Sequence, residues 1–209
     1  MYRAHPDREL RDKFERRPYQ GADPSSAAYV FVGLDANYAE DIEAHPIYSD
    51  VLEYHADGVA FWQGHGVHHP FLLPSYSGDG RRYHLNFARI GFAPTQAEQV
   101  SFVELLHVPS VGRNSLHPSD LSSAHLRWLD SVMRGSQARH VFVSAGVERL
   151  MRASGVFPWL ESARTVNGEL PILYRRGDCT VYRHLHFSNY GKFQRQMNEE
   201  ALAIAALCR

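Results

Sequence analysis

Cysteine, lysine and long apolar runs are all scarce in this chain of 209 residues. Cys179 and Cys208 are its only cysteines, too few for a tetrathiolate zinc site or for the thiolates of an iron–sulfur cluster. The longest apolar stretches, Ala27–Leu34, Val100–Leu106 and Val141–Ala145, are far shorter than the about 20 residues that span a bilayer. We therefore expect no membrane-spanning segment and no membrane partner.

Positive charge on the chain is almost entirely arginine, because Lys13 and Lys192 are the only lysines. The formal net charge is −1 at pH 7, so any surface that binds nucleic acid must be a local patch. Residues 1–17 are polar and charged and do not contain the apolar stretch of a secretory signal peptide. We therefore expect a cytoplasmic monomer with two free thiols.

The length and the composition, 44% hydrophobic and 22% charged, are those of one compact globular domain. Pro6–Arg16 is predicted to form a short charged helix, and Pro18–Ser26 a linker rich in proline, glycine and serine. Residues 1–26 are thus predicted to precede a single domain over residues 27–209.

Apolar runs alternate with amphipathic stretches along the rest of the chain. Buried strands are predicted at Ala27–Val32, Val100–Leu106 and His140–Ala145, with one or two more in Leu170–Tyr174 and Thr180–Arg183. The predicted helices are Arg81–Ile90, Ser119–Met133, Val147–Ala153 and Gly191–Cys208, with a helix interrupted by Pro46 in Asn37–Asp57 and an irregular stretch at Gly58–Gly80. This order predicts an α/β fold, a three-layer α/β/α sandwich around a mostly parallel four-stranded sheet.

Polar side chains stand at the carboxyl ends of the first and last predicted strands, where ligands bind in parallel sheets. Asp35 and Asn37 follow the first strand, and His186 and Ser188 follow the last. A simpler explanation is available at both places. Asp and Asn are favoured in turns, and Ser188 or Asn189 can cap the helix that follows.

Together, these two strand ends and the order of the elements resemble the uracil-DNA glycosylase superfamily, over about Ala27–Leu207. Gly33–Asp35 fits the first motif of that family, and His186–Ser188 fits the last, which begins His-Pro-Ser. The resemblance implies a uracil-DNA glycosylase-like fold. The cluster cysteines of the family's iron–sulfur members are missing, so we expect no iron–sulfur cluster and no other cofactor.

The resemblance implies a DNA-repair hydrolase that binds DNA and cleaves the N-glycosidic bond of a flipped damaged or deaminated base. Asp35 would stabilise the positive charge on the sugar and orient the attacking water, and His186 would donate a hydrogen bond to the oxyanion on the departing base. Ser188 would hold a flanking phosphate. The other expected substrate contacts are Gly33, Leu34, Asn37 and Asn189, with Tyr38 or Phe61 stacked on the base and Tyr190, Lys192 or Phe193 in the gap that it leaves.

Glu104 stands where the family has an asparagine that recognises uracil with one donor and one acceptor. An ionised glutamate offers acceptors only. Three explanations are open: the preferred base carries an amino group, Glu104 is protonated, or Glu104 points away into a structural salt bridge with an arginine.

Four histidines, His55, His65, His68 and His69, cluster in and beside the irregular stretch. We predict that they line a substrate-facing loop. The spacing His65-x-x-His68-His69 would also suit a metal, but no cysteine or carboxylate accompanies it at a regular spacing, so we expect no metal site. The absence of a G-x-G-x-x-G pattern likewise gives no support for a dinucleotide site.

Two other functions remain open. The first alternative is a catalytically inactive module that binds nucleic acid or nucleotides on the same fold. The second is a hydrolase of a small nucleoside-like ligand. A basic strip of Arg113, Lys192 and Arg195 around the pocket would favour DNA over a small ligand. Asp35 facing His186 would favour catalysis over simple binding.

Overall fold

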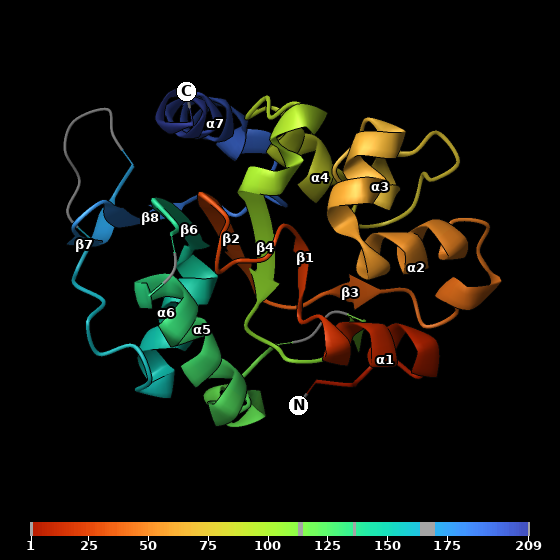
Figure 1. Cartoon of the computed structure of the whole chain (residues 1–209), viewed down its shortest axis with the longest axis horizontal. Coiled ribbons are helices and arrows are strands. Elements are labelled where there is room, and N and C mark those ends of the chain that lie inside the picture. The colour runs from red at the N-terminus through yellow and green to blue at the C-terminus, as the bar shows by residue number, and fades with distance from the viewer. Residues whose placement is uncertain (1, 113–114, 136, 164–169, 209) are drawn as a thin grey trace.

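A mixed six-stranded sheet forms the centre of the part of the chain that the computed structural model describes, residues 2–112, 115–135, 137–163 and 170–208 (Figure 1). The strands in spatial order are β1 (Tyr19–Gly21), β4 (Val100–Glu104), β2 (Tyr29–Gly33), β6 (His140–Ser144), β8 (Cys179–His184) and β7 (Ile172–Arg176). The four central strands run parallel, whereas β1 and β7 are antiparallel at the two edges. The predicted α/β class and the predicted central strands are therefore confirmed.

The sheet has two edge strands more than the four strands predicted. β1 lies within Pro18–Ser26, which was predicted as a linker, and pairs with β4 so that Gln20 is opposite Phe102. Three residues are too few to show a strand periodicity, so β1 is specified by its pairing with β4 and not by its own pattern. At the other edge, β7 overlaps the predicted stretch Leu170–Tyr174 and forms a hairpin with β8 across Gly177.

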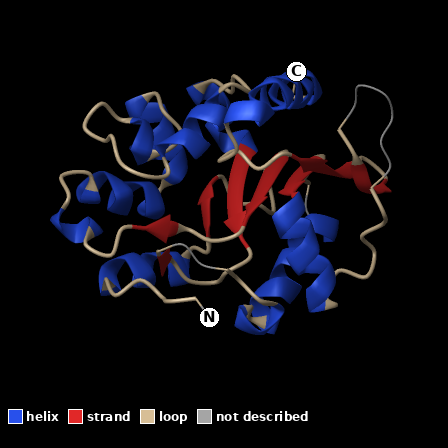
Figure 2. Cartoon of the chain, turned by 180° about the vertical axis from the view of Figure 1, so that it is seen from behind, coloured by secondary structure: helices blue, strands red, loops and turns tan. Residues whose placement is uncertain are grey.

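Helices lie against both faces of the sheet (Figure 2). Val30 and Val32 of β2 point into an aliphatic core shared with α5 (Ser123–Gly135) and α6 (Ala145–Ser154). Phe31, between them, points the other way into an aromatic core with α4 (Arg81–Ala88) and α7 (Gln194–Leu207). The alternation of a strand thus explains how a continuous apolar run fills two cores.

The stretch Gly58–Gly80, predicted as irregular, begins with α3 (Gly58–His65). The Asp57 carboxylate caps this helix by accepting hydrogen bonds from the backbone N–H groups of Val59 and Ala60. Its two glycines hide a helical pattern in the sequence. α2 (Tyr48–Ala56) packs beside α3, and α1 (Arg8–Arg16) packs beside α2, all on the β1 side of the sheet (Figure 1).

Smaller differences from the predicted elements concern the ends of helices. Pro118–Asp120 forms a 3₁₀ turn, so Ser119 does not cap a helix, and α5 starts at Ser123. Gly191–Phe193 is likewise a 3₁₀ turn before α7. A short parallel pair, β3 (Asn37–Tyr38) and β5 (Ser110–Val111), lies beside the sheet. No helix in the described ranges combines the length and apolarity needed to cross a membrane.

Candidate active site

A cavity of about 250 Å³ opens at the carboxyl ends of the central strands. Residues 33–38 line it from the end of β2, Phe102 and Glu104 from β4, and His186 and Ser188 from the segment after β8. The volume is slightly below that of pockets for drug-sized ligands, and so suits one small ring system. The strand-end residues that the sequence singled out therefore meet at one place.

The carboxylate of Asp35 is fixed by two neighbours. The hydroxyl of Ser110, which is fully buried on β5, donates a hydrogen bond to Oδ2 of Asp35. Nδ2 of Asn37 donates to the same oxygen at 3.2 Å, and also to Oγ of Ser110 at 2.9 Å. These hydrogen bonds orient the carboxylate at the cavity wall.

His186 is held in one tautomer. Its Nδ1 accepts a hydrogen bond from the backbone N–H of Ser188 at 3.2 Å and lies 2.7 Å from the hydroxyl oxygen of that residue. Because a backbone N–H can only donate, Nδ1 carries no proton, and the ring proton of the neutral imidazole is on Nε2. Burial lowers the pKa of His186, while the nearby carboxylate of Asp35 acts in the opposite direction. His186 is therefore a neutral hydrogen-bond donor at the cavity.

Two asparagines fix the segment that carries His186. The buried Asn86 of α4 donates from Nδ2 to the carbonyls of Phe187 at 2.5 Å and Asn189 at 3.3 Å. Asn189 in turn donates from Nδ2 to the carbonyl of His186 at 2.9 Å. Asn189 was predicted to contact substrate, but it does not line the cavity and instead holds this segment in place.

Glu104 presents a carboxyl group to the cavity without any salt bridge in the described residues. Its Oε2 is buried and has no hydrogen-bond partner there. Burial, and to a smaller extent the charge of Asp35, raise the pKa of Glu104 well above its usual value. Of the three explanations, the structural salt bridge is therefore wrong for the described part of the chain, and protonation is favoured over an ionised carboxylate facing an amino group.

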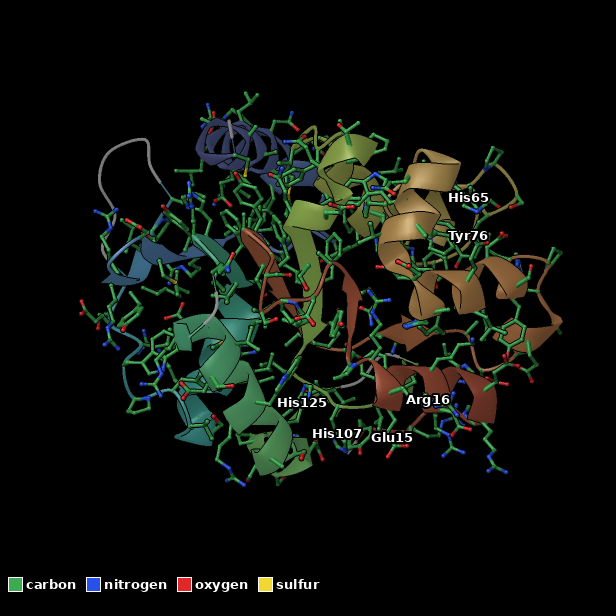
Figure 3. All side chains as sticks on the ribbon, in the orientation of Figure 1. Glu15, Arg16, His65, Tyr76, His107 and His125 are labelled. Atoms are coloured by element: carbon green, nitrogen blue, oxygen red, sulfur yellow. The ribbon has the colours of Figure 1, made fainter. Side chains whose placement is uncertain are left out.

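The backbone of Glu104 is fixed from the opposite side of the sheet. Its carbonyl oxygen lies 2.8 Å from Nε2 of His125 on α5. His125 and His107 lie close together below β4 in Figure 3, with their ring centroids 6.3 Å apart. This contact anchors the end of β4, while the side chain of Glu104 points to the cavity.

The wall opposite the strand ends is aromatic. The rings of His69 and His84 stack with their centroids 3.5 Å apart, and those of Tyr83 and His186 are 5.4 Å apart. Tyr54 lies against His69 at 4.7 Å. Burial lowers the pKa of His69 and of His84 well below the usual value, so both rings are neutral. A flat, uncharged ring is the shape and polarity that this wall accommodates.

The structure brings most of the predicted site residues together. Those that line the cavity are Gly33, Leu34, Asp35, Asn37, Tyr38, Glu104, His186 and Ser188. The exceptions have other environments. Phe61 is fully buried against Tyr54 and His65 and does not line the cavity, so it is not placed to stack on a bound base. Tyr190 and Lys192 are exposed to solvent and do not line the cavity. Arg113, part of the predicted basic strip, lies outside the described residues.

The four clustered histidines do not act together. Nε2 of the exposed His65 lies 3.3 Å from Glu53, on the outer side of α3 (Figure 3). His55 lies 2.7 Å from the Tyr38 hydroxyl, and His68 is buried, so among these four only His69 lines the cavity. In the described ranges, the ligand atoms that come close enough for a metal are those of the half-buried Asp50 and the exposed Glu53 and His65, none of which lines the cavity.

Several residues of the site were not found from the sequence. Ser110 does not line the cavity but holds Asp35 from behind, and it comes after the second predicted strand, in the region where parallel sheets place their sites. Gln20 comes from the unpredicted β1, and Tyr83 and His84 come from a helix whose packing partner was unknown. The hydrogen bond between Ser110 and Asp35 is a tertiary contact that no local pattern encodes.

Comparisons with known proteins do not identify the chain. No protein-family model matches its sequence, and no curated protein matches it.

Proposed function

We propose that this protein is a hydrolase of N-glycosidic bonds, of the uracil-DNA glycosylase type, that acts on a base inserted into the cavity. The observation that carries the proposal is that the fixed carboxylate of Asp35 and the neutral Nε2–H tautomer of His186 line one cavity of about 250 Å³. The resemblance in the order of elements and in the two motifs supports the same assignment, including the three-layer sandwich of that family.

The proposed reaction needs a ring held in the cavity with its sugar at the mouth. The bond between C1′ and the ring nitrogen breaks, and its electron pair moves onto the base. The Nε2–H of His186 donates a hydrogen bond to the oxygen on which negative charge develops. Asp35 stabilises the positive charge on the sugar and accepts a hydrogen bond from a water that attacks C1′. That water supplies the hydroxyl of the sugar product and the proton of the released base.

A small nucleoside-like substrate is a second candidate. Two carboxyl groups line the cavity, and its described lining includes neither lysine nor arginine. Such a cavity binds an uncharged ring and leaves any phosphate outside. Whether the sugar belongs to DNA or to a free nucleoside therefore depends on the surface around the mouth.

Base release from defined substrates tests the proposal. Oligonucleotides with a single uracil, hypoxanthine, xanthine or mismatched thymine, single- and double-stranded, are incubated with the protein, and abasic sites are detected by alkaline cleavage. The matching deoxynucleosides are assayed in parallel by chromatography of the free base. Asp35→Asn and His186→Ala are expected to slow release by about 10²-fold or more.

The matched control is Asp178→Asn, which removes an exposed carboxylate in the turn between β7 and β8. It should keep the wild-type rate. Absence of base release from every substrate, or an unchanged rate in Asp35→Asn, would overturn the proposal and leave a binding module.

A further inference from the structure

Two buried polar groups at the floor of the cavity have no partner in the described residues. They are Nε2 of Gln20 and Oε2 of Glu104. Gln20 is 4% exposed and belongs to β1, an edge strand that the sequence did not predict. A buried amide or carboxyl that makes no hydrogen bond costs about 1–3 kcal/mol, so such groups call for an explanation.

Strand pairing places both groups on the same face of the sheet. Gln20 on β1 is directly opposite Phe102 on β4, so their side chains point the same way. Glu104 is two residues beyond Phe102 and therefore shares that face as well. All three line the cavity. The floor thus carries the carboxamide of Gln20 and the phenyl ring of Phe102, which are paired across β1 and β4, and the carboxyl group of Glu104 further along β4, on the side of Gly33.

We propose that Gln20 and Glu104 together form the recognition surface for the hydrogen-bonding edge of the bound ring, with Glu104 acting as a neutral acid. The inference rests on the proposed function and names its substrate class, a base that carries carbonyl groups beside a ring N–H. No role in the reaction itself is assigned to either residue.

The match follows from donors and acceptors. A neutral carboxyl group offers one O–H donor and one carbonyl acceptor, and the carboxamide of Gln20 adds an N–H donor. These two donors and one acceptor are the set that an imide edge requires, in which an N–H stands between two carbonyls, as in uracil. The pairing edge of adenine offers only one donor and one acceptor, N6–H and N1, which the acid satisfies, so the amide of Gln20 stays unpaired. Such an unpaired group weakens binding by about tenfold or more.

The charged and titratable groups that face Glu104 support its neutral form. The nearby carboxylate is that of Asp35, which disfavours a second negative charge, and the phenols of Tyr38, Tyr54 and Tyr83 supply no positive charge. Together with enclosure of Oε2, this arrangement keeps the proton on Glu104, so the acid can donate.

The test measures binding of free bases by titration calorimetry or ligand-observed NMR, with no bond cleavage. We expect uracil to bind wild type at least about tenfold more tightly than adenine or 3-methyluracil, which lacks the N–H between the two carbonyls. Gln20→Met and Glu104→Met should each weaken uracil binding about tenfold. Glu104→Gln, which keeps a neutral donor and acceptor, should recover most of that loss.

Controls keep the outcome interpretable. Gln63→Met replaces an exposed glutamine on α3 and should bind uracil as wild type does. If Gln20→Met does not fold, Gln20→Asn can replace it, because it withdraws the amide by one methylene and should also weaken uracil binding. Infrared difference spectra of wild type against Glu104→Gln should show the carbonyl band of a protonated carboxyl.

Equal affinity for uracil and adenine, unchanged uracil binding in the Gln20 variants, or an ionised Glu104 in the spectra would each overturn the inference. Failure of the proposed function is distinguishable. A protein that binds uracil through these residues but releases no base from any substrate contradicts the hydrolase proposal and leaves the recognition surface in place.

Discussion

The carboxyl group of Glu104 occupies the space that a side chain on Gly33 would need. The two residues are paired across the parallel strands β2 and β4, and a Cβ on Gly33 would overlap both oxygens of the carboxyl group. The missing side chain of Gly33 therefore has a purpose that concerns the site. It leaves room for the carboxyl group of Glu104 close to the backbone of β2.

Gly33→Ala should accordingly damage the site more than the fold. The carboxyl group is the far end of a flexible side chain, so it can move aside, and we expect a loss of about 1–3 kcal/mol in the free energy of unfolding. Uracil binding should fall about tenfold because the acid no longer meets the ring edge. Urea unfolding and base titration measure the two effects.

The control for this variant is Gly64→Ala. Gly64 is exposed in α3, and an added Cβ there would meet nothing within 4 Å. Alanine should stabilise the helix by up to about 1 kcal/mol and leave binding unchanged. Equal uracil binding in Gly33→Ala and Gly64→Ala would contradict the role given to Gly33.

Ser110→Ala tests how Asp35 is positioned. The substitution removes the hydroxyl that donates to the carboxylate and leaves Asn37 as its neighbour. We expect base release to slow by about tenfold, less than in Asp35→Asn, because the charge stays while its orientation is lost. Steady-state kinetics should show this loss mainly as a lower kcat, with little change in KM.

Ser131→Ala is the matched control for that measurement. Its hydroxyl is exposed on α5 and donates to the backbone carbonyl of Trp128. Wild-type rates are expected for this variant. A Ser110→Ala protein that is equally fast would show that Asn37 alone suffices to orient Asp35.

The sequence predicts the site residues that follow predicted strands. It does not predict those whose position depends on tertiary packing. Asp35 and His186 follow predicted strands, so the rule for parallel sheets predicts from the sequence alone that they lie close together. Gln20 could not be found in this way, because a three-residue edge strand has no periodicity of its own. Tyr83 and His84 lie on a helix whose orientation depends on packing against the aromatic core.

Glu104 illustrates a different limit. The sequence identified the residue but left its protonation state open. That state depends on enclosure of Oε2 and on the distance to Asp35, which are properties of the folded chain.

Buried histidines should make the fold sensitive to acid. Burial lowers the pKa of His55 and of His68 to about 3, and that of His184 to about 4. In the unfolded chain each would take up a proton near pH 6.5, so the unfolded state binds more protons between these values. Above about pH 6.5 the buried histidines therefore do not lower the free energy of unfolding. Below that pH the free energy of unfolding falls by up to about 1.4 kcal/mol per pH unit for each histidine.

Urea unfolding at several pH values measures that slope. His68→Phe, which keeps a ring beside Phe87, should reduce the slope by about one proton. His65→Gln alters an exposed side chain and should leave it unchanged. A slope that is the same in His68→Phe as in wild type would show that His68 does not remain neutral in the fold.

Tyr190 separates the two substrate classes. Its side chain is 65% exposed, and the guanidinium of Arg82 lies 4.3 Å from the centre of its ring. Both residues neighbour the cavity lining in sequence, because Arg82 precedes Tyr83 and Tyr190 follows Ser188 by two positions. An exposed aromatic ring beside a cation suits a nucleobase next to the flipped one, with its phosphate near the arginine.

If DNA is the substrate, Tyr190→Ala should weaken binding of a uracil-containing oligonucleotide by about tenfold, since stacking contributes about 1–3 kcal/mol per base. Hydrolysis of deoxyuridine should be unaffected, because a nucleoside has no neighbouring base. Leu202→Ala, which removes an exposed apolar side chain on α7, is the control and should change neither. Fluorescence anisotropy at fixed salt gives the affinity, and chromatography gives the nucleoside rate. An equal loss on both substrates would place Tyr190 in the cavity mechanism, and unchanged DNA affinity would favour the small nucleoside-like ligand.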